Sequence, residues 1–404
     1  MSLQHNHHQN HQIYNFLQNK ELNALYFSYG LINFALGMVM LFVPIYLYKL
    51  GYSISWILIY FFIMQASFVI FAYRGALVFS KYGVKHTFAI AVVIQIIFLF
   101  GLKLLPDFRW LFYILPIVYA FKVMLYAYSF HVNFILHSDK KNRGKEVSMA
   151  QAAALVGGLL SPFIGGLLIN FLGFNVLFLV ATFFLIVSLI PLMFFKEEYE
   201  KISFDKNNLY KGIFKRENLP KTLSFSGYAI EDLIGGVIWP LFLFVSFLKV
   251  ESIGLVTSLI ALLTFLTFYF VGRITDKRDK KQLLKIGTIL YFFGWIARLF
   301  VSGFFSLLFV DTYKDISSRI LQIPWTAYSY DLAAKSDYFK FIVQREITYD
   351  LSRVIFMPFL ILIFIINYHP FVLSFILAAL ASLFYVTLSK TEIVDKVLEY
   401  EKSN

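Results

Sequence analysis

The chain has 404 residues, of which 59% are hydrophobic and 20% aromatic, while only 15% are charged and the formal net charge is +12. A soluble domain carries about 25% charged residues, so this composition excludes a soluble enzyme, a disordered chain and a nucleic-acid-binding protein, whose basic side chains cluster on a water-facing surface. The absence of cysteine excludes a disulfide framework and a thiolate metal site. What remains is an all-α, polytopic membrane protein.

The apolar runs predict twelve membrane-spanning helices, because each run has about 20 residues or more, the length that crosses the hydrocarbon core. In chain order we expect them at 24–49, 54–79, 86–105, 109–135, 146–171, 173–195, 222–248, 252–273, 283–303, 304–334, 341–366 and 370–389. The longest connection separates two groups of six. The predicted organisation is an N-terminal tail (1–23), a first bundle (24–195), a central loop (196–221), a second bundle (222–389) and a C-terminal tail (390–404).

The basic residues predict the orientation of these helices. With the N-terminus inside, the inner segments hold 26 of the 36 Lys and Arg residues, and the outer segments hold 4. Lys and Arg accumulate in cytoplasmic loops. We therefore expect both termini in the cytoplasm and the chain in a plasma membrane, the inner membrane of a bacterium.

The two groups of helices also look repeated. The sequence AYSF at 127–130 matches AYSY at 327–330, and the pair Lys145-Glu146 matches Arg345-Glu346, both at a separation of 200 residues. Internal repetition with a binding site between the halves is a common plan of transporters.

The loop at 272–281 reads GRITDKRDKK, and it resembles the signature loop of the major facilitator superfamily. The corresponding loop of the first half, ALVFSKYGVK at 76–85, keeps its glycine and two basic residues but has Ser80 in place of the aspartate. We expect Asp276 to bond backbone amides at a helix end; the alternative is that the basic residues are topology charges only. The expected gating residues of the two loops are Ser80, Lys81, Gly83, Gly272, Asp276 and Lys277.

The fifth predicted helix carries glycines and a proline in a pattern that resembles the antiporter motif of the same family. Small residues let two helices approach closely, and a proline bends a helix. The alternative is ordinary small-residue packing without a link to transport direction. The residues of this pattern are Gly157, Ser161, Pro162, Gly165 and Gly166.

The resemblance implies two pseudo-symmetric six-helix bundles around a central cavity that opens alternately to the two sides of the membrane. It does not imply a substrate, because one fold serves many functions.

The tenth predicted helix carries a stripe of polar side chains. They fall at relative positions 0, 3, 4, 7, 8 and 11, one face of a helix, and are Asp311, Lys314, Asp315, Ser318, Arg319 and Gln322. A charge near the bilayer centre costs about 2.5–3.5 kcal/mol on insertion scales, so this face cannot meet lipid. We expect it to face the cavity, with Lys314 and Arg319 paired to the two aspartates through i,i+3 and i,i+4 contacts.

Three other predicted helices add polar residues to the expected cavity lining, for substrate binding or proton coupling. They are Asn33 in the first, Lys122 and Tyr126 in the fourth, and Glu231 and Asp232 in the seventh. Lys122, Lys314 and Arg319 are candidates to bind an anionic group of a substrate. Of the two adjacent carboxylates, the buried one is the better candidate for reversible protonation. The alternative for each residue is a charge pair that holds two helices together.

The eleventh predicted helix carries a second charged set: Arg345, Glu346, Asp350 and Arg353. We expect Arg345 and Glu346 to contact the signature loops at an inner gate, and Arg353 to pair with Asp350 or Glu346. Arg298, close to the outer end of the ninth helix, is expected to reach the membrane interface by snorkelling.

The sequence therefore predicts a secondary transporter of a small polar or charged solute, with the proton as coupling ion and a preference for export. Uptake by symport is one alternative, and a non-transport sensor or structural membrane protein on the same fold is another. No enzyme signature is apparent, and we expect no cofactor and no metal. The expected partners are the solute, the coupling ion and membrane lipid, without nucleic acid, and the protein is expected to be a monomer.

Overall fold

The computed structural model describes residues 20–137, 143, 147–148, 158–192, 206–246 and 248–391. Within these residues every regular element is a helix. A bilayer requires this, because its core offers no water to satisfy exposed backbone groups. The predicted all-α, polytopic membrane fold is confirmed.

The first half begins with α2 (Lys20–Val39), which continues through a 3-10 turn, η1 (Met40–Phe42), into α3 (Val43–Lys49). It goes on with α4 (Ile54–Leu104), α5 (Leu111–His137) and α7 (Ser161–Leu192). The 51 residues of α4 would extend about 77 Å at 1.5 Å per residue, more than a membrane accommodates. Gly83, with φ +72°, divides α4, and Gly173, with φ +81°, divides α7. Only glycine adopts this backbone region readily, so each of these helices provides two spans.

The second half follows the short helices α8 (Lys206–Lys211) and η3 (Arg216–Asn218). Its first span combines α9 (Leu219–Leu233), a π-helical turn η4 (Ile234–Ile238) and α10 (Trp239–Ser246). The remaining elements are α11 (Val250–Lys277), α12 (Lys280–Ala297) with η5 (Arg298–Phe300), α13 (Phe304–Ala334), α14 (Tyr338–Ile366), and α15 (Pro370–Ser382) with η6 (Leu383–Lys390).

Nine helices of the described part are long and apolar enough to cross a membrane. Counting the two glycine-broken helices twice, and adding the charged helix α13, gives the twelve predicted spans. The prediction for the fifth helix falls partly on residues outside the described ranges, including Gly157. Pro162 lies in the first turn of α7, directly after a bend at 159–160, where a proline needs no hydrogen-bond partner.

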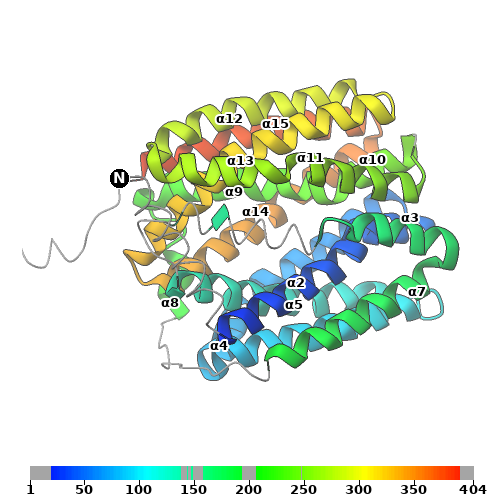
Figure 1. Ribbon diagram of the computed structural model, residues 1–404, viewed down its shortest axis with the longest axis horizontal. Coiled ribbons are helices and arrows are strands. Elements are labelled where there is room, and N and C mark those ends of the chain that lie inside the picture. The colour runs from blue at the N-terminus through cyan, green and yellow to red at the C-terminus, as the bar shows by residue number, and fades with distance from the viewer. Residues whose placement is uncertain are drawn as a thin grey trace, which may run out of the picture.

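The helices form two bundles that lie side by side, the first half below and the second above in Figure 1. We call the end that carries Lys81 and Lys280 the basic end. Near that end the rings of Phe79 and Phe339 stack across the two halves at 4.9 Å. Near the opposite end the rings of Tyr48 and Phe244 approach to 6.2 Å. The halves therefore touch at both ends of the bundles.

Close backbone contact joins α7 of the first half to α11 of the second. A Cβ atom on Gly166 would lie 3.0 Å from the Cα of Glu251. A Cβ atom on Gly254 would collide with the backbone of Pro162, and one on Gly165 would collide with the backbone of Met38 in α2. These glycines therefore set the distance between three helices, which gives a packing function to the motif found in the sequence.

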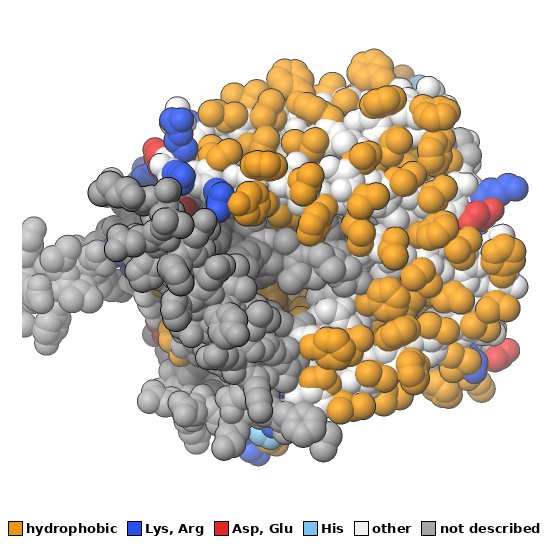
Figure 2. Space-filling view, in the orientation of Figure 1, with side chains coloured by type: hydrophobic (Ala, Val, Ile, Leu, Met, Phe, Trp, Pro, Cys, Tyr) orange, Lys and Arg blue, Asp and Glu red, His pale blue; other side chains and the backbone are white. Residues whose placement is uncertain are grey.

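Large hydrophobic side chains cover the outer surface between the two ends of the molecule (Figure 2), whereas the visible Lys, Arg, Asp and Glu side chains lie toward the ends. Exposed aromatic residues such as Phe171, Phe300 and Phe309 belong to this surface. A water-soluble monomer does not expose so large an apolar area, so this surface faces lipid.

Candidate functional site

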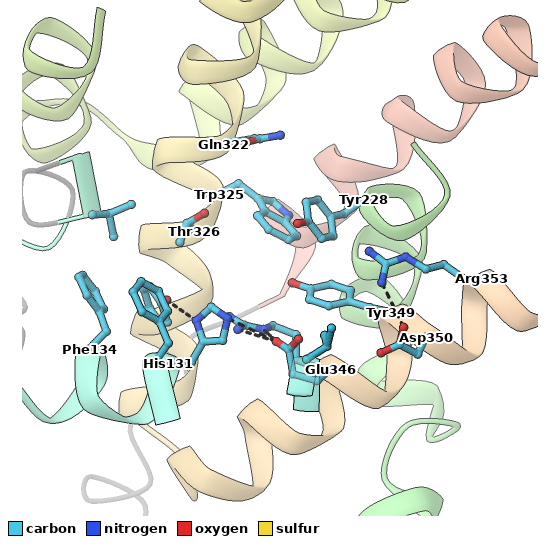
Figure 3. A pocket seen from close by; sticks show the side chains of 15 residues that line it. His131, Phe134, Tyr228, Gln322, Trp325, Thr326, Glu346, Tyr349, Asp350 and Arg353 are labelled. Carbon is cyan, nitrogen blue, oxygen red and sulfur yellow. Dashed lines mark hydrogen bonds and ion pairs between the residues drawn. The ribbon is translucent and has the colours of Figure 1, made fainter. Parts of the chain in front are cut away.

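A cavity of about 330 Å³ lies between the two halves. The first half contributes α5, and the second contributes α9, α13 and α14 (Figure 3). The lining residues are Val123, Phe130, His131, Phe134, Val147, Tyr228, Gln322, Trp325, Thr326, Tyr330, Arg345, Glu346, Tyr349, Asp350 and Arg353. The cavity thus combines aromatic rings with charged side chains of both signs.

One histidine joins the two halves at the edge of this cavity. His131 Nδ1 lies 2.6 Å from the hydroxyl of Tyr330 in α13, and its Nε2 lies 3.7 Å from a carboxylate oxygen of Glu346 in α14. The ring of Phe134 stacks on Tyr330 at 4.6 Å. His131 is a hydrogen-bonded interior residue. What the sequence did not indicate is that its partners belong to the other half.

The charged residues of α14 line the second-half side of the cavity and occur as pairs. Arg345 donates to Glu346 at 2.8 Å and 3.1 Å. Arg353 donates to Asp350 at 3.1 Å and to Asp232 of α9 at 2.7 Å. The predicted pairing of Arg353 with Asp350 is confirmed. The charges of this wall are therefore balanced within the protein.

The expected contact of Arg345 and Glu346 with the signature loop is wrong. Arg345 lies seven residues into α14, about 10 Å from its start, and so reaches the cavity instead of the loop. The loop is held by Asp331, in the last turn of α13. Its carboxylate accepts from Lys280 at 2.6 Å and from Arg143 at 2.7 Å.

In the second-half signature loop, the helix after the loop is capped by a neighbour of Asp276. Asp276 lies in the last turn of α11 and is partly exposed, and its neighbour Lys277 is exposed. The carboxylate that caps the next helix belongs to Asp279, which accepts from the backbone amide of Lys281 at 2.9 Å. Asp279, and not Asp276, therefore caps α12; the expected bond of Asp276 to backbone amides at a helix end stays a prediction.

In the first-half loop and in α11 the remaining gating candidates occupy different environments. Ser80 and Gly272 are buried, and the ammonium of Lys81 lies over the ring of Tyr82 at 5.0 Å. Gly83 provides the left-handed backbone that reverses the chain between two spans. In this loop, the backbone conformation of Gly83 accounts for the reversal of the chain, and the charged side chains are not needed for it.

The polar stripe of α13 packs inside the second half and does not face the central cavity as predicted. Asp311 accepts from Arg298 at 2.7 Å and from the indole of Trp239 at 2.9 Å. Lys314 donates to the hydroxyl of Tyr291 at 2.9 Å, so it is not the partner of Asp311. A Cβ atom on Gly294 would lie 3.1 Å from the Cα of Lys314. This glycine lets α12 approach α13 and provides the stripe with a protein environment.

The part of the stripe nearer the basic end has the predicted ion pair and the predicted position at the cavity. Arg319 lies 3.6 Å from Asp315, and Gln322 lines the cavity. The stripe starts at Asp311, eleven residues and about 16 Å along the axis from Gln322. Most of its charges therefore lie beyond the cavity.

Arg298 does not snorkel to the interface, which corrects the prediction. Its side chain is only 5% exposed, and its guanidinium lies over the rings of Trp239 at 3.9 Å and Trp295 at 4.6 Å. The ion pair with Asp311 explains the burial. The sequence could have suggested this pair, because thirteen residues separate the two across one tight helix connection.

The two adjacent carboxylates of α9 have different environments. Glu231 is buried and accepts from the hydroxyls of Tyr291 and Tyr385, the latter at 3.3 Å. Asp232 is about half exposed and pairs with Arg353. Of these two, Glu231 is the residue that fits the predicted condition for reversible protonation.

The first-half candidates surround an aromatic group. The ammonium of Lys122 lies 4.7 Å from the ring centre of Tyr126 and 5.4 Å from that of Tyr119. The amide of Asn33 donates to the backbone carbonyl of Tyr29 at 2.8 Å. None of these side chains belongs to the cavity lining described above, although Val123, the next residue after Lys122, does.

Two helical bundles that enclose a cavity with charged and aromatic walls define the class of membrane transporters. Residues 25–248, more than half of the chain, match the Major Facilitator Superfamily. The chain belongs to this family and is a transporter of its type.

Curated relatives are distant. The chain is 21% identical over 218 residues to the uncharacterized protein YqgE of Bacillus subtilis, and the aligned part covers 51% of this chain and about half of that relative (50%). It is 23% identical over 287 residues to the multi-drug resistance efflux pump PmrA of Streptococcus pneumoniae, covering 66% of this chain and 69% of the pump.

Solved structures share the fold over nearly the full chain. A D-xylose-proton symporter matches with a TM-score of 0.69 at 15% identity, covering 92% of this chain and 99% of the symporter. The transporter FucP in its outward conformation matches with a TM-score of 0.64 at 10% identity, covering 91% and 97%. At these identities the likeness establishes the fold alone.

Proposed function

We propose that this transporter moves a small polar or charged solute by alternating access, in exchange for protons and in the direction of export. The observation that carries the proposal is the cavity between the halves. Its volume of about 330 Å³ lies at the low end of ligand pockets. Paired charges and aromatic rings in its wall suit a small solute that has hydrogen-bonding groups and a flat apolar part.

Contacts on both sides of the cavity support the alternating motion. The Phe79–Phe339 stack closes the halves toward the basic end, and the approach of Tyr48 to Phe244 closes them toward the opposite end. Opening one of these contacts while the other stays closed would connect the cavity to one side of the membrane. The basic end is the cytoplasmic side in this proposal, with the two bundles at 24–195 and 222–389 moving as units of one monomer in a bacterial inner membrane.

Glu231 is the proposed proton-carrying group. It is buried, and its oxygens accept from tyrosine hydroxyls instead of pairing directly with a cation. Its neighbour Asp232 binds Arg353, which lines the cavity. A proton that binds or leaves Glu231 would therefore change the charge next to a group that faces the solute.

Export is favoured by the relatives in sequence. Of the proteins compared, the efflux pump PmrA aligns with two thirds of this chain. The symporter is similar in fold alone and carries no argument about direction.

The test uses proteoliposomes that contain a pH-sensitive dye and start without a pH gradient. Solutes from several classes, namely sugars, amino acids, aromatic acids and aromatic amines, are added outside one at a time. Proton exchange predicts that an accepted solute raises the internal pH, because protons leave as the solute enters. Protein-free liposomes are the control for passive permeation, and Glu231→Gln is the control for coupling, since it should lose the pH change.

Each result decides between the alternatives. A fall in internal pH that depends on the protein would mean symport, and the proposed direction would be wrong. Flux of a labelled solute without any pH change would refute proton coupling. No flux of any solute would refute transport and favour a sensor.

A further inference from the structure

Lys122 is a buried cation without an acidic partner among the described residues. Its side chain is 5% exposed, and in the described residues it contacts tyrosine rings and no carboxylate. Between residues 24 and 138 the sequence contains a single acid, Asp107, in the connection before α5. Lys122 lies eleven residues into α5, about 16 Å from that connection. The next acids in the sequence, Asp139 and Glu146, come after the end of α5 and lie outside the described residues.

The surroundings compensate this charge only partly. The faces of Tyr119 and Tyr126 attract a cation through their quadrupoles, at 5.4 Å and 4.7 Å from the ring centres. A charge inside a membrane protein normally pairs with another group or marks a substrate pathway. The cavity wall illustrates the first case, since Arg345 and Arg353 both bind carboxylates. Lys122 has no such carboxylate among the described residues.

Neighbours of Lys122 connect it to the cavity. Val123, its chain neighbour, lines the cavity. The ring of Tyr126, over which the ammonium lies, stacks at 6.1 Å on the ring of Phe130, which also lines the cavity. The four-carbon stem of a lysine is flexible, so the charge can turn from the tyrosine faces toward a ligand.

Resting on the proposed transport function, we infer that the solute is a small organic anion with a flat apolar body, and that Lys122 binds its anionic group. The body of the anion lies against the rings of Trp325 and Tyr349, which belong to the second half. One solute then contacts both halves, and the charge that it brings neutralises a cation that the protein leaves without a partner.

The experiment measures melting of the purified protein against three anionic probes, benzoate, phenylacetate and phenylphosphonate. Benzamide is the neutral match of benzoate, and benzylamine is the cationic match. For the wild type we expect a saturable rise in melting temperature with at least one anion, because a ligand that binds the folded state stabilises it. The half-saturating concentration should be about tenfold to a hundredfold lower for benzoate than for benzamide, the range of a hydrogen bond to a charged group.

Variants assign the effect to Lys122. Lys122→Gln should lose the preference for benzoate over benzamide, and Lys122→Arg should keep it. Lys103→Gln removes a cation in the last turn of α4, outside the cavity lining, and should change nothing. Lys122→Gln without a probe should melt no lower than the wild type, since it removes a buried charge that lacks a partner.

Three results would overturn the inference. They are an unchanged benzoate preference in Lys122→Gln, a large loss of its stability without any probe, and no response of the wild type to any of the three anions. If amines or sugars drive proton exchange in proteoliposomes while anions do not, this inference fails and the proposed transport function stands.

Discussion

Replacing Arg298 by methionine should destabilise the second half strongly. Methionine keeps a long apolar stem but leaves the Asp311 carboxylate with the indole of Trp239 as its remaining hydrogen-bond donor, at 2.9 Å. Asp311 is itself buried, at 7% exposure. Removing one partner of a buried ion pair costs about 3–5 kcal/mol, because the other charge stays buried without compensation.

This loss converts into a measurable change in melting temperature. Unfolding entropy amounts to about 2.1 cal/mol/K per residue. If all 404 residues unfold together, the melting temperature should fall by about 4–6 °C. The assay is thermal unfolding of the detergent-purified protein, followed by intrinsic tryptophan fluorescence.

Two further variants separate the ion pair from other effects. Arg298→Met combined with Asp311→Leu removes both charges and should recover most of the stability, because the two residues act on each other. Arg319→Met removes a more exposed ion pair, at 3.6 Å from Asp315, which contributes about 0–1 kcal/mol. If Arg298→Met melts like Arg319→Met, the guanidinium reaches the interface and the reasoning is refuted.

Three more predictions follow from the packing and the charges. Glu231→Gln should abolish the solute-driven pH change while labelled solute still exchanges, and a full pH change in this variant would place the proton site elsewhere. Asp331→Asn should lower the melting temperature more than Asp337→Asn does, because it leaves Arg143 and Lys280 without their shared carboxylate. Asp337 is an exposed helix cap that contributes about 1 kcal/mol. Equal effects of the two substitutions would show that the contact between Asp331, Arg143 and Lys280 is not stabilising. Gly254→Leu should reduce transport far more than Gly236→Leu in the same assay. A side chain at 254 meets the backbone of Pro162, whereas the position at 236 is open. Equal activity of the two variants would mean that transport does not need close contact between α7 and α11.

The sequence contains most of the information about the fold. Apolar runs of membrane length identify the spans, and the glycines at 83 and 173 divide the two longest helices into four. The charges of α13 place that helix in the interior, because they cannot face lipid. Spacing along one helix also predicted the Arg353–Asp350 and Arg319–Asp315 pairs, since both are local contacts.

Contacts between helices could not be predicted in the same way. Helical periodicity defines which residues share a face, but it does not define which neighbour that face meets. Periodicity therefore predicts that the stripe beginning at Asp311 faces the cavity, although its partners lie on η5, α10 and α12. The His131–Tyr330 contact spans 199 residues and depends on how the two halves meet.

The most direct test of the alternating motion uses cross-linking at both ends of the bundles. The chain has no cysteine, so a cysteine pair at Phe79 and Phe339, or a pair at Tyr48 and Phe244, can be introduced without removing others. In proteoliposomes with an accepted solute, a short bifunctional maleimide on either pair should stop transport, while each single-cysteine variant treated with the same reagent should remain active. Transport that continues with both pairs cross-linked would contradict the account, because the halves would then carry solute without moving against each other.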